Sequence, residues 1–191
     1  MKVNIAGYNI DKELIDKLQS PLATPELISA SYARISRSNK SIADLRKEAM
    51  MELEKARKTN TNIIFSMGHS SVAEHSVFNI DLSGISRALT ELVEHSRIAS
   101  FTEKSQRYVT FNKDYVVPPE FANRPKLKQP YQKLMDKLFA EYELCYLALN
   151  EFYKEQKPEL KTRERECLAK EDARYILPLS TKTQLGMTIN A

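Results

Sequence analysis

Apolar residues recur every three to four positions in three stretches of the chain, a spacing that places them on one face of a helix. The first stretch begins at Pro25, whose fixed φ suits a first helical turn. The second follows Gly84, and the third, from Pro130 to Gln156, is the longest. The apolar positions of the second and third stretches are Ile85, Ala88, Leu89, Leu92 and Val93, and then Tyr131, Leu134, Leu138, Tyr142, Cys145, Leu149 and Phe152. We predict helices over 25–36, 85–97 and 130–156.

Three other stretches have helical signals of a different kind. Residues 11–18 follow an aspartate cap, and residues 41–57 are strongly charged. Residues 163–177 are closed by Pro178, which cannot continue a helix. Between the charged helix and Gly68 we expect another short helix or turn.

Apolar alternation and β-rich composition predict the strands. Residues 3–10 and 75–85 alternate well enough for strands, the second partly buried. Residues 183–191 form a last strand, and the segment QRYVTF over 106–111 has β-rich composition.

The composition is that of a globular protein with a core. The chain has 191 residues, of which 42% are hydrophobic and 28% charged, so we expect a single domain over residues 1–191. No apolar run approaches the roughly 20 residues that cross a bilayer. Charges such as Lys2 and Asp11 interrupt any secretory signal at the start. We therefore expect a cytoplasmic protein without membrane association.

The charge favours an anionic ligand over a nucleic acid. The net charge is +4, without the concentrated basic stripe of nucleic-acid binders, so we expect no nucleic-acid partner. The four glycines form no glycine-rich phosphate loop. Arginine is the side chain best shaped to bind phosphate, but a single arginine is more often a solvated charge. The candidates are Arg87, Arg97, Arg107 and Arg174. The residues alone predict no more than an anion pocket.

All three histidines lie between residues 69 and 95, close in sequence to Glu74 and Glu103. His69 and His75 are six residues apart, which fits neither one helical face nor strand alternation, so we predict no metal site. A structural hydrogen bond is the usual role of an isolated histidine. Ser105 has no histidine at the spacing of a known nucleophile elbow. The two cysteines, Cys145 and Cys167, form no CxxC pair and are expected to be reduced.

Six blocks, in one order along the chain, carry a resemblance to a known family. They are ARIS, GHSSVAEHSVF, GISRALT, RIASFTEKSQRYV, EDARYILP and a final TIN-A. Together they resemble the flavin-dependent thymidylate synthases over roughly residues 30–110 and 165–191. The family signature reads R-H-R-x-x-S-x-N-E-x-S-x-R-Y, where this chain has H-S-R-I-A-S-F-T-E-K-S-Q-R-Y from His95 to Tyr108. His95, Ser96 and Thr102 replace the family's Arg, His and Asn, and Leu92 stands where relatives have a glutamine.

The resemblance implies roles for the matching residues. Those implied to bind the flavin are Ser36, His69, Ser71, Glu74, His95, Ser96, Arg97, Ile98 and Asn190. Those implied to bind the nucleotide are Glu103, Ser105, Arg107 and Arg174. Arg97, Ser105 and Arg107 are the implied catalytic residues, with Ser105 a hydrogen-bond partner of the substrate. A helix and the loop after it would supply arginines and backbone amides for the phosphate.

The implied fold is α+β, an antiparallel sheet with long helices packed against it. The implied reaction is reductive methylation of dUMP to dTMP, with FAD as the flavin, methylenetetrahydrofolate as carbon donor and NADPH as reductant. The implied assembly is a homotetramer with shared active sites. The family continues beyond the TVNAR block, so we expect the domain to lack its C-terminal segment at Ala191.

Two other functions stay open at this point. The changes at His95 and Ser96 also suit a relative that binds nucleotide or flavin as a non-catalytic or regulatory subunit. The histidine cluster leaves open an unrelated metal-dependent hydrolase.

Overall fold

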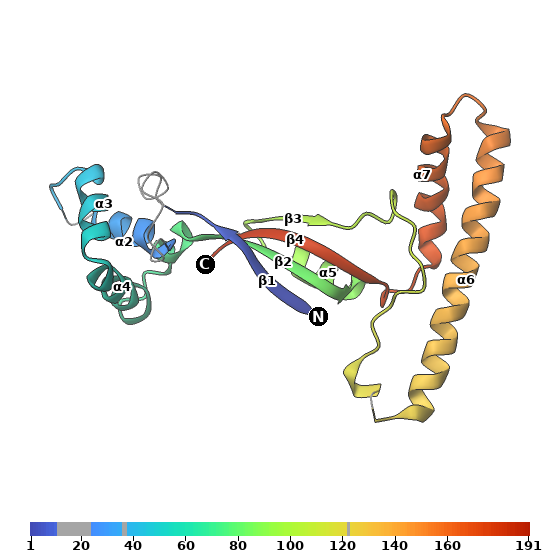
Figure 1. Ribbon diagram of the computed structural model, residues 1–191, viewed down its shortest axis with the longest axis horizontal. Helices are drawn as coiled ribbons and strands as arrows, with labels where there is room; N and C mark the ends of the chain where they lie inside the picture. The colour runs from blue at the N-terminus through green and yellow to red at the C-terminus, as the bar shows by residue number, and fades with distance from the viewer. Residues whose placement is uncertain (11–23, 36–37, 122) are drawn as a thin grey trace. The chain divides into compact units, whose positions relative to one another are not determined.

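The computed structural model of the protein describes residues 1–10, 24–35, 38–121 and 123–191. Its helices are α2 (Glu26–Ile35), α3 (Ile42–Met51), α4 (Leu53–Thr61), α5 (Arg87–Glu94), α6 (Pro125–Gln156) and α7 (Thr162–Ala173). Its strands are β1 (Lys2–Tyr8), β2 (Val77–Ser86), β3 (Ala99–Glu103) and β4 (Lys182–Asn190). Short 3-10 helices cover Ser70–His75, Pro119–Phe121 and Arg174–Ile176, and a π-turn covers Asn62–Ser66. The strands form one antiparallel sheet in the order β1-β2-β4-β3, which confirms the α+β class (Figure 1).

The chain divides into two compact units, and strands of the sheet contribute to both. The N-terminal unit comprises residues 3–81, 97–101 and 186–191. The hairpin unit comprises residues 1–2, 82–96 and 102–185. Each is described by itself below.

Small residues form the core of the N-terminal unit. Leu27 and Ala30 of α2 cluster with Ala49 of α3 and Ala56 of α4, and the three alanines have no exposed surface. Alanines at these positions let the helix backbones come close together. The charged stretch predicted as one helix over 41–57 is two helices, because Glu52 has non-helical backbone angles (φ −123°, ψ 55°). The break leaves both Ala49 and Ala56 buried.

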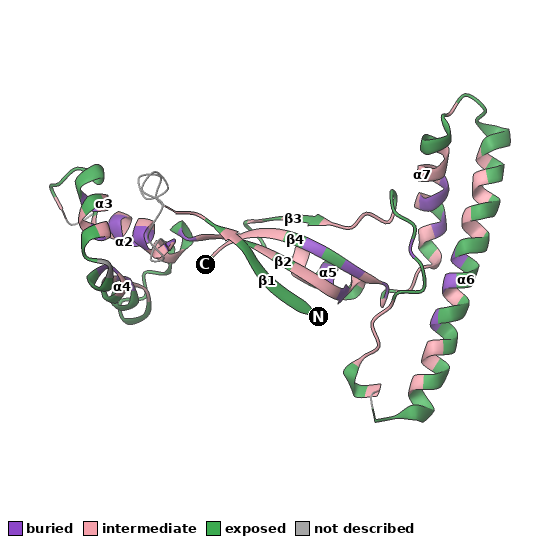
Figure 2. Cartoon of the chain, in the orientation of Figure 1, coloured by how far each residue is buried: buried purple, intermediate pink, exposed green. Residues whose placement is uncertain are grey.

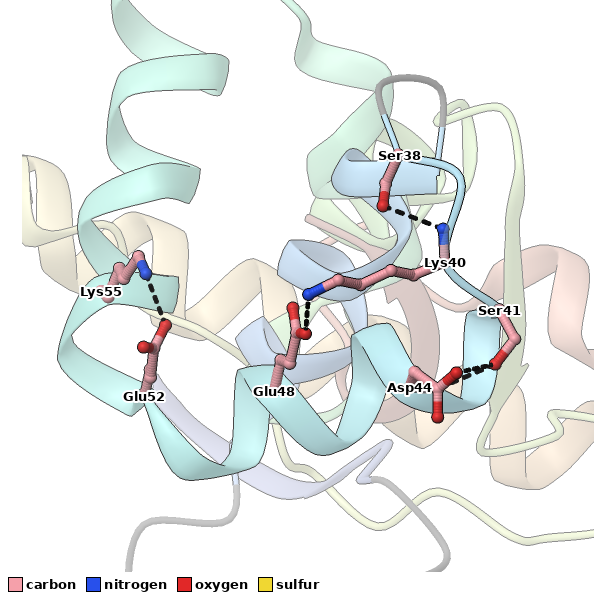
Figure 3. A network of polar contacts seen from close by, with 7 residues as sticks. All are labelled: Ser38, Lys40, Ser41, Asp44, Glu48, Glu52 and Lys55. Carbon is pink, nitrogen blue, oxygen red and sulfur yellow. Dashed lines mark hydrogen bonds and ion pairs between the residues drawn. The ribbon is translucent and has the colours of Figure 1, made fainter.

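Polar contacts hold the start of α3. The Ser41 hydroxyl accepts a hydrogen bond from the Asp44 amide at 3.2 Å, the usual role of an N-cap serine. Lys40 pairs with Glu48, and Lys55 pairs with Glu52 at 2.7 Å across the break (Figure 3). The side chains of all these pairs are largely exposed, so the ion pairs add little to the stability of the fold and act mainly on the local course of the chain.

A two-helix hairpin of α6 and α7 dominates the hairpin unit. Met135, Phe139 and Tyr142 are the buried residues of α6, at spacings of four and three, and Ala169 and Ala173 are buried in α7 (Figure 2). The predicted α6 face is confirmed in part: Tyr142 is buried, and Leu138 and Cys145 are partly buried. Leu134 and Phe152, however, are each 52% exposed, and Met135 and Phe139 are buried instead. The physical reason is an aromatic cluster in which the Phe139 ring stacks on Tyr115, drawing the helix face toward it. Tyr115, Phe121, Tyr131 and Phe139 form this cluster.

Two boundaries differ from the prediction. Helix α6 begins at Pro125 and runs through Pro130, because a proline removes only one of the many hydrogen bonds of a 32-residue helix. The β-rich segment over 106–111 forms no strand, and β3 lies before it. There the Ser105 hydroxyl accepts the Arg107 amide hydrogen at 3.1 Å, so a local turn replaces the sheet ladder.

The other predicted elements within the described residues are present. β1, α2, β2, α7 and β4 lie where the sequence patterns placed them. Helix α5 is also present, but the fully buried residue on it is Thr90, while Leu92 is 70% exposed. The helix predicted over 11–18 lies outside the described residues. No helix in the described part of the chain is long and apolar enough to cross a membrane.

Candidate functional site

The flavin-matched residues of the N-terminal unit gather on one short turn. Gly68, at φ +73°, reverses the chain before His69, a conformation that glycine adopts without strain. His69 then caps the 3-10 helix Ser70–His75, which carries Ser71 and Glu74. The side chains of His69, Ser71 and Glu74 are all exposed. The turn therefore offers an imidazole, a hydroxyl and a carboxylate to a ligand.

Hydrogen bonds from distant parts of the chain hold this turn. The Ser29 hydroxyl of α2 donates to the Val72 carbonyl at 2.6 Å. The Asn190 side-chain amide donates to the Glu74 carbonyl at 2.7 Å. The Tyr32 ring meets the His75 ring edge-on, with centroids 4.9 Å apart. Two predicted flavin residues, Glu74 and Asn190, are thus in contact, although 116 positions separate them.

A cavity of about 880 Å³ opens beside the same turn, within the N-terminal unit. Ligand sites usually have volumes of roughly 300–1,000 Å³. Ser70 and Glu74 line it, together with Asn60 and Arg57 of α4 and apolar residues that include Phe78. Asn60 is 6% exposed; its amide nitrogen donates to the Glu26 carbonyl, but its amide oxygen has no partner in the described part of the chain. Asn60 thus carries a buried acceptor without a partner beside this cavity.

Arg97 and Ile98 belong to the same unit and are exposed. Ile98 has φ +59° and is 83% exposed. A β-branched residue in this left-handed region is a true outlier, with a cost of roughly 1–2 kcal/mol. Such strained residues concentrate at ligand sites.

Three nucleotide-matched residues, Glu103, Ser105 and Arg107, lie in the hairpin unit, at the end of β3 and in the turn after it. The carboxylate of Glu103 pairs with the Arg87 guanidinium, and the Thr90 hydroxyl lies 3.2 Å from its second oxygen. Two residues on, the Ser105 hydroxyl oxygen accepts the Arg107 amide hydrogen. This turn directs the Arg107 side chain outward, where it is exposed.

One ion pair joins the two nucleotide-matched blocks. Arg107 Nη2 lies 3.0 Å from Glu171 Oε2 of α7, and Arg174 follows three residues later at the end of that helix. The Arg174 guanidinium lies over the Tyr175 ring, 5.7 Å from its centroid. The structure thus places Arg107 beside the helix end that carries Arg174.

Comparisons with known proteins show the family of this chain. A profile of the family described as Thymidylate synthase complementing protein matches residues 13–191. The chain belongs to that family. It is 32% identical over 176 residues to a flavin-dependent thymidylate synthase of Clostridium tetani, a match that covers 92% of this chain and 69% of the relative. It is 33% identical over 173 residues to the enzyme of that name from Nitratidesulfovibrio vulgaris, covering 87% and 66%.

A solved structure shares the fold. It is the crystal structure of a UMP/dUMP methylase PolB from Streptomyces cacaoi bound with 5-Br dUMP, with a TM-score of 0.67 and 18% identity. The match covers 99% of this chain and 72% of the methylase chain. Membership of the thymidylate synthase complementing protein family removes the alternative of an unrelated metal-dependent hydrolase. No group of three or more possible metal ligands occurs among the residues that the structure describes.

Two other predicted flavin residues, His95 and Ser96, take part in none of the side-chain contacts described above. His95 and Ser96 are exposed just after α5, and their backbone amides bond to the Val93 carbonyl. Ser36 lies outside the described residues.

The first-turn amides of α5 are not free for a phosphate. The Arg87 and Ala88 amides donate to the Thr181 and Leu179 carbonyls, each at 3.0 Å. In the loop, the Lys104 amide donates to the Gln184 carbonyl at 3.0 Å. The expectation that backbone amides bind the phosphate therefore does not fit these three amides.

Sequence reasoning missed four polar residues at these sites: Asn60, Arg87, Thr90 and Glu171. Arg87 was considered only as a possible phosphate ligand, and the structure pairs it with Glu103 instead. Arg87 and Thr90 stand in the GISRALT block and Glu171 in the EDAR block, so their blocks were the available signal. Asn60 lies in no such block.

Proposed function

We propose that this chain carries out the flavin-dependent reductive methylation of dUMP to dTMP. The observation that carries the proposal is the pairing of Arg107 with Glu171, which brings two nucleotide-matched blocks to one place in the hairpin unit. The two relatives named above are called flavin-dependent thymidylate synthases, and this chain spans about two thirds of their lengths.

Each nucleotide-matched side chain has a role that suits its chemistry. The guanidinium groups of Arg107 and Arg174 bind the phosphate of dUMP, since arginine binds phosphate through two parallel hydrogen bonds. The carboxylate of Glu103 accepts a hydrogen bond from the substrate. Ser105 uses its oxygen to accept the Arg107 amide, so its own hydroxyl hydrogen is available to donate to the substrate.

The N-terminal unit has groups that fit FAD. His69, Ser71 and Glu74 are exposed on one turn, and Asn190 fixes the Glu74 backbone beside the cavity. Arg97 and Ile98 of this unit also belong to the predicted flavin set. The resemblance adds Ser36, and His95 and Ser96 of the hairpin unit. When bound, the flavin supplies the hydride, and the chain supplies binding and orientation. We propose NADPH as the reductant of the flavin and methylenetetrahydrofolate as the carbon donor.

Exposed apolar residues support a homotetramer with shared active sites. Val3 and Ile5 of β1 are 56% and 64% exposed, and they lie on the same face of the strand. In the hairpin unit Leu92 is 70% exposed. Neighbouring exposed apolar side chains mark association surfaces. A charged residue at one of them, Ile5→Glu, should shift the mass measured by analytical ultracentrifugation toward the monomer, whereas Lys2→Glu on the opposite face should not. The expectation of a cytoplasmic protein stays a prediction.

The test is titration of the purified chain with dUMP, with and without FAD, followed by a turnover assay. The assay contains FAD, NADPH and methylenetetrahydrofolate and measures dTMP. Formation of dTMP together with dUMP binding that tightens in FAD supports the proposal. Binding without dTMP formation would favour the non-catalytic subunit instead, and no binding of either ligand would contradict both.

A further inference from the structure

The Glu103 carboxylate is held at both of its oxygens by helix α5. Oε2 pairs with Arg87 Nη1, and Oε1 lies 3.2 Å from the Thr90 hydroxyl. The Glu103 side chain is 13% exposed and that of Arg87 28%, while Thr90 is fully buried. Rotation of the carboxylate would therefore break both contacts.

Arg87 is itself held in place. Its backbone amide donates to the Thr181 carbonyl at 3.0 Å, and its Nε lies 3.7 Å from Glu91 one turn along the helix. The Ser86 hydroxyl caps the same helix by accepting from the Leu89 amide at 3.3 Å. The guanidinium thus projects from a fixed part of the backbone.

Thr90 makes the weaker contact. A hydroxyl has one hydrogen, and the Thr90 Oγ1 also lies 2.7 Å from the Arg87 carbonyl oxygen, so the two acceptors share that hydrogen in a three-centre arrangement. Arg87 therefore exerts the main restraint on Glu103, and Thr90 adds to it.

We infer that Arg87 is a positioning residue that fixes Glu103 for the nucleotide, with Thr90 in support. This inference rests on the proposed function, because it takes Glu103 to contact dUMP. An isolated, partly exposed ion pair adds little stability. The ion pair has a larger effect on ligand affinity, since an acceptor that is already fixed loses no conformational entropy when the ligand binds. Arg87 contributes through Glu103 and does not itself bind the nucleotide.

The test is a double-mutant cycle on dUMP binding, measured by calorimetry on the full chain with FAD present. Arg87→Ala should weaken dUMP binding by about tenfold, and Arg87→Lys should recover part of the loss because it keeps the charge. In a Glu103→Gln background, Arg87→Ala should cause little further loss. Arg163→Ala, which removes an exposed arginine of α7, is the control and should leave the affinity unchanged in both backgrounds.

The cycle separates positioning from simple structural support. If Arg87→Ala unfolds the chain in thermal melts, Thr90→Val takes its place, since it keeps the size and removes the hydroxyl; its smaller loss should also disappear with Glu103→Gln. Equal losses in both backgrounds would overturn the positioning role alone. A wild-type chain that fails to bind dUMP would overturn the proposed function, and the positioning role with it.

Discussion

The side-chain amide of Asn190 donates a 2.7 Å hydrogen bond to the backbone carbonyl of Glu74. The bond ties the end of β4 to the turn that carries His69 and Ser71. A side chain that fixes a backbone carbonyl in this way controls where the next groups of the turn point. Asn190 therefore acts on the flavin-matched residues indirectly, by fixing the backbone of their turn, in addition to any direct contact with the flavin.

Replacing Asn190 with alanine should weaken FAD binding by about 1 kcal/mol, the usual net value of one hydrogen bond. The measurement is a titration that follows flavin fluorescence. Asn79→Ala is the matched control, because Asn79 makes a comparable exposed bond of 2.8 Å, to Thr188, in the same unit. Equal losses in the two variants would show that the Glu74 contact has no special role.

Replacing Arg107 or Arg174 with alanine should weaken dUMP binding by about 1.5–3 kcal/mol, the range for a hydrogen bond to a charged group. Calorimetry at constant ionic strength measures the change, since salt screens such contacts. Arg163→Ala is the control for the loss of one positive charge. Unchanged affinity in both variants would remove the proposed phosphate site.

Replacing His95 with arginine should tighten FAD binding. The change introduces a guanidinium with a permanent charge and two parallel donors at an exposed position after α5. We expect an increase of about fivefold to tenfold, near 1 kcal/mol. His95→Lys adds charge without the planar fork and should give a smaller gain. Equal gains in the two variants would mean that charge alone is responsible.

The stability of the hairpin unit should fall at alkaline pH. Burial raises the pKa of Tyr142 above its ordinary value of 10.0. The unfolded chain then loses the phenolic proton first, so the free energy of unfolding declines as pH rises above 10.0 and through the folded pKa. Tyr142→Phe should reduce this decline in thermal melts, although Tyr115 and Tyr146 share the same direction of shift. Tyr175→Phe, at an 81% exposed position, should leave it unaltered.

Enlarging Ala49 should destabilise the N-terminal unit. Ala49 has no exposed surface and packs in the cluster with Leu27, Ala30 and Ala56. We expect Ala49→Leu to cost about 1–3 kcal/mol in urea unfolding, the usual range for overpacking. Ala43→Leu changes an exposed alanine of the same helix and should cost far less. Similar midpoints for the two variants would argue against a close-packed cluster.

Periodicity predicted the elements whose burial follows from their own pattern. Strands β2 and β4 are of this kind. It missed Phe139 on the buried side of α6, because the ring of Tyr115 is brought to Phe139 by the fold. It could not find Thr90 as a buried residue either, since the partners that satisfy its hydroxyl, such as Glu103, are brought to it by the fold.

In the candidate site, too, motifs identify residues but do not reveal the contacts between them. Motif blocks named Glu103, Arg107 and Arg174, but the ion pair between Arg107 and Glu171 joins side chains 64 positions apart. The free oxygen of Asn60 depends on where Glu26 places its carbonyl. Both relationships arise from tertiary packing, which a single sequence does not specify.

The turn at Ser105 also determines which inhibitors suit this chain. The hydroxyl oxygen accepts the Arg107 amide hydrogen, and no hydrogen bond within the described residues joins it to a histidine or a carboxylate. A serine without a neighbouring base keeps its proton and is a poor nucleophile. Covalent reagents that trap the activated serine of hydrolases should therefore leave the chain unmodified. Reversible anions that compete for Arg107 and Arg174 are the more suitable starting compounds.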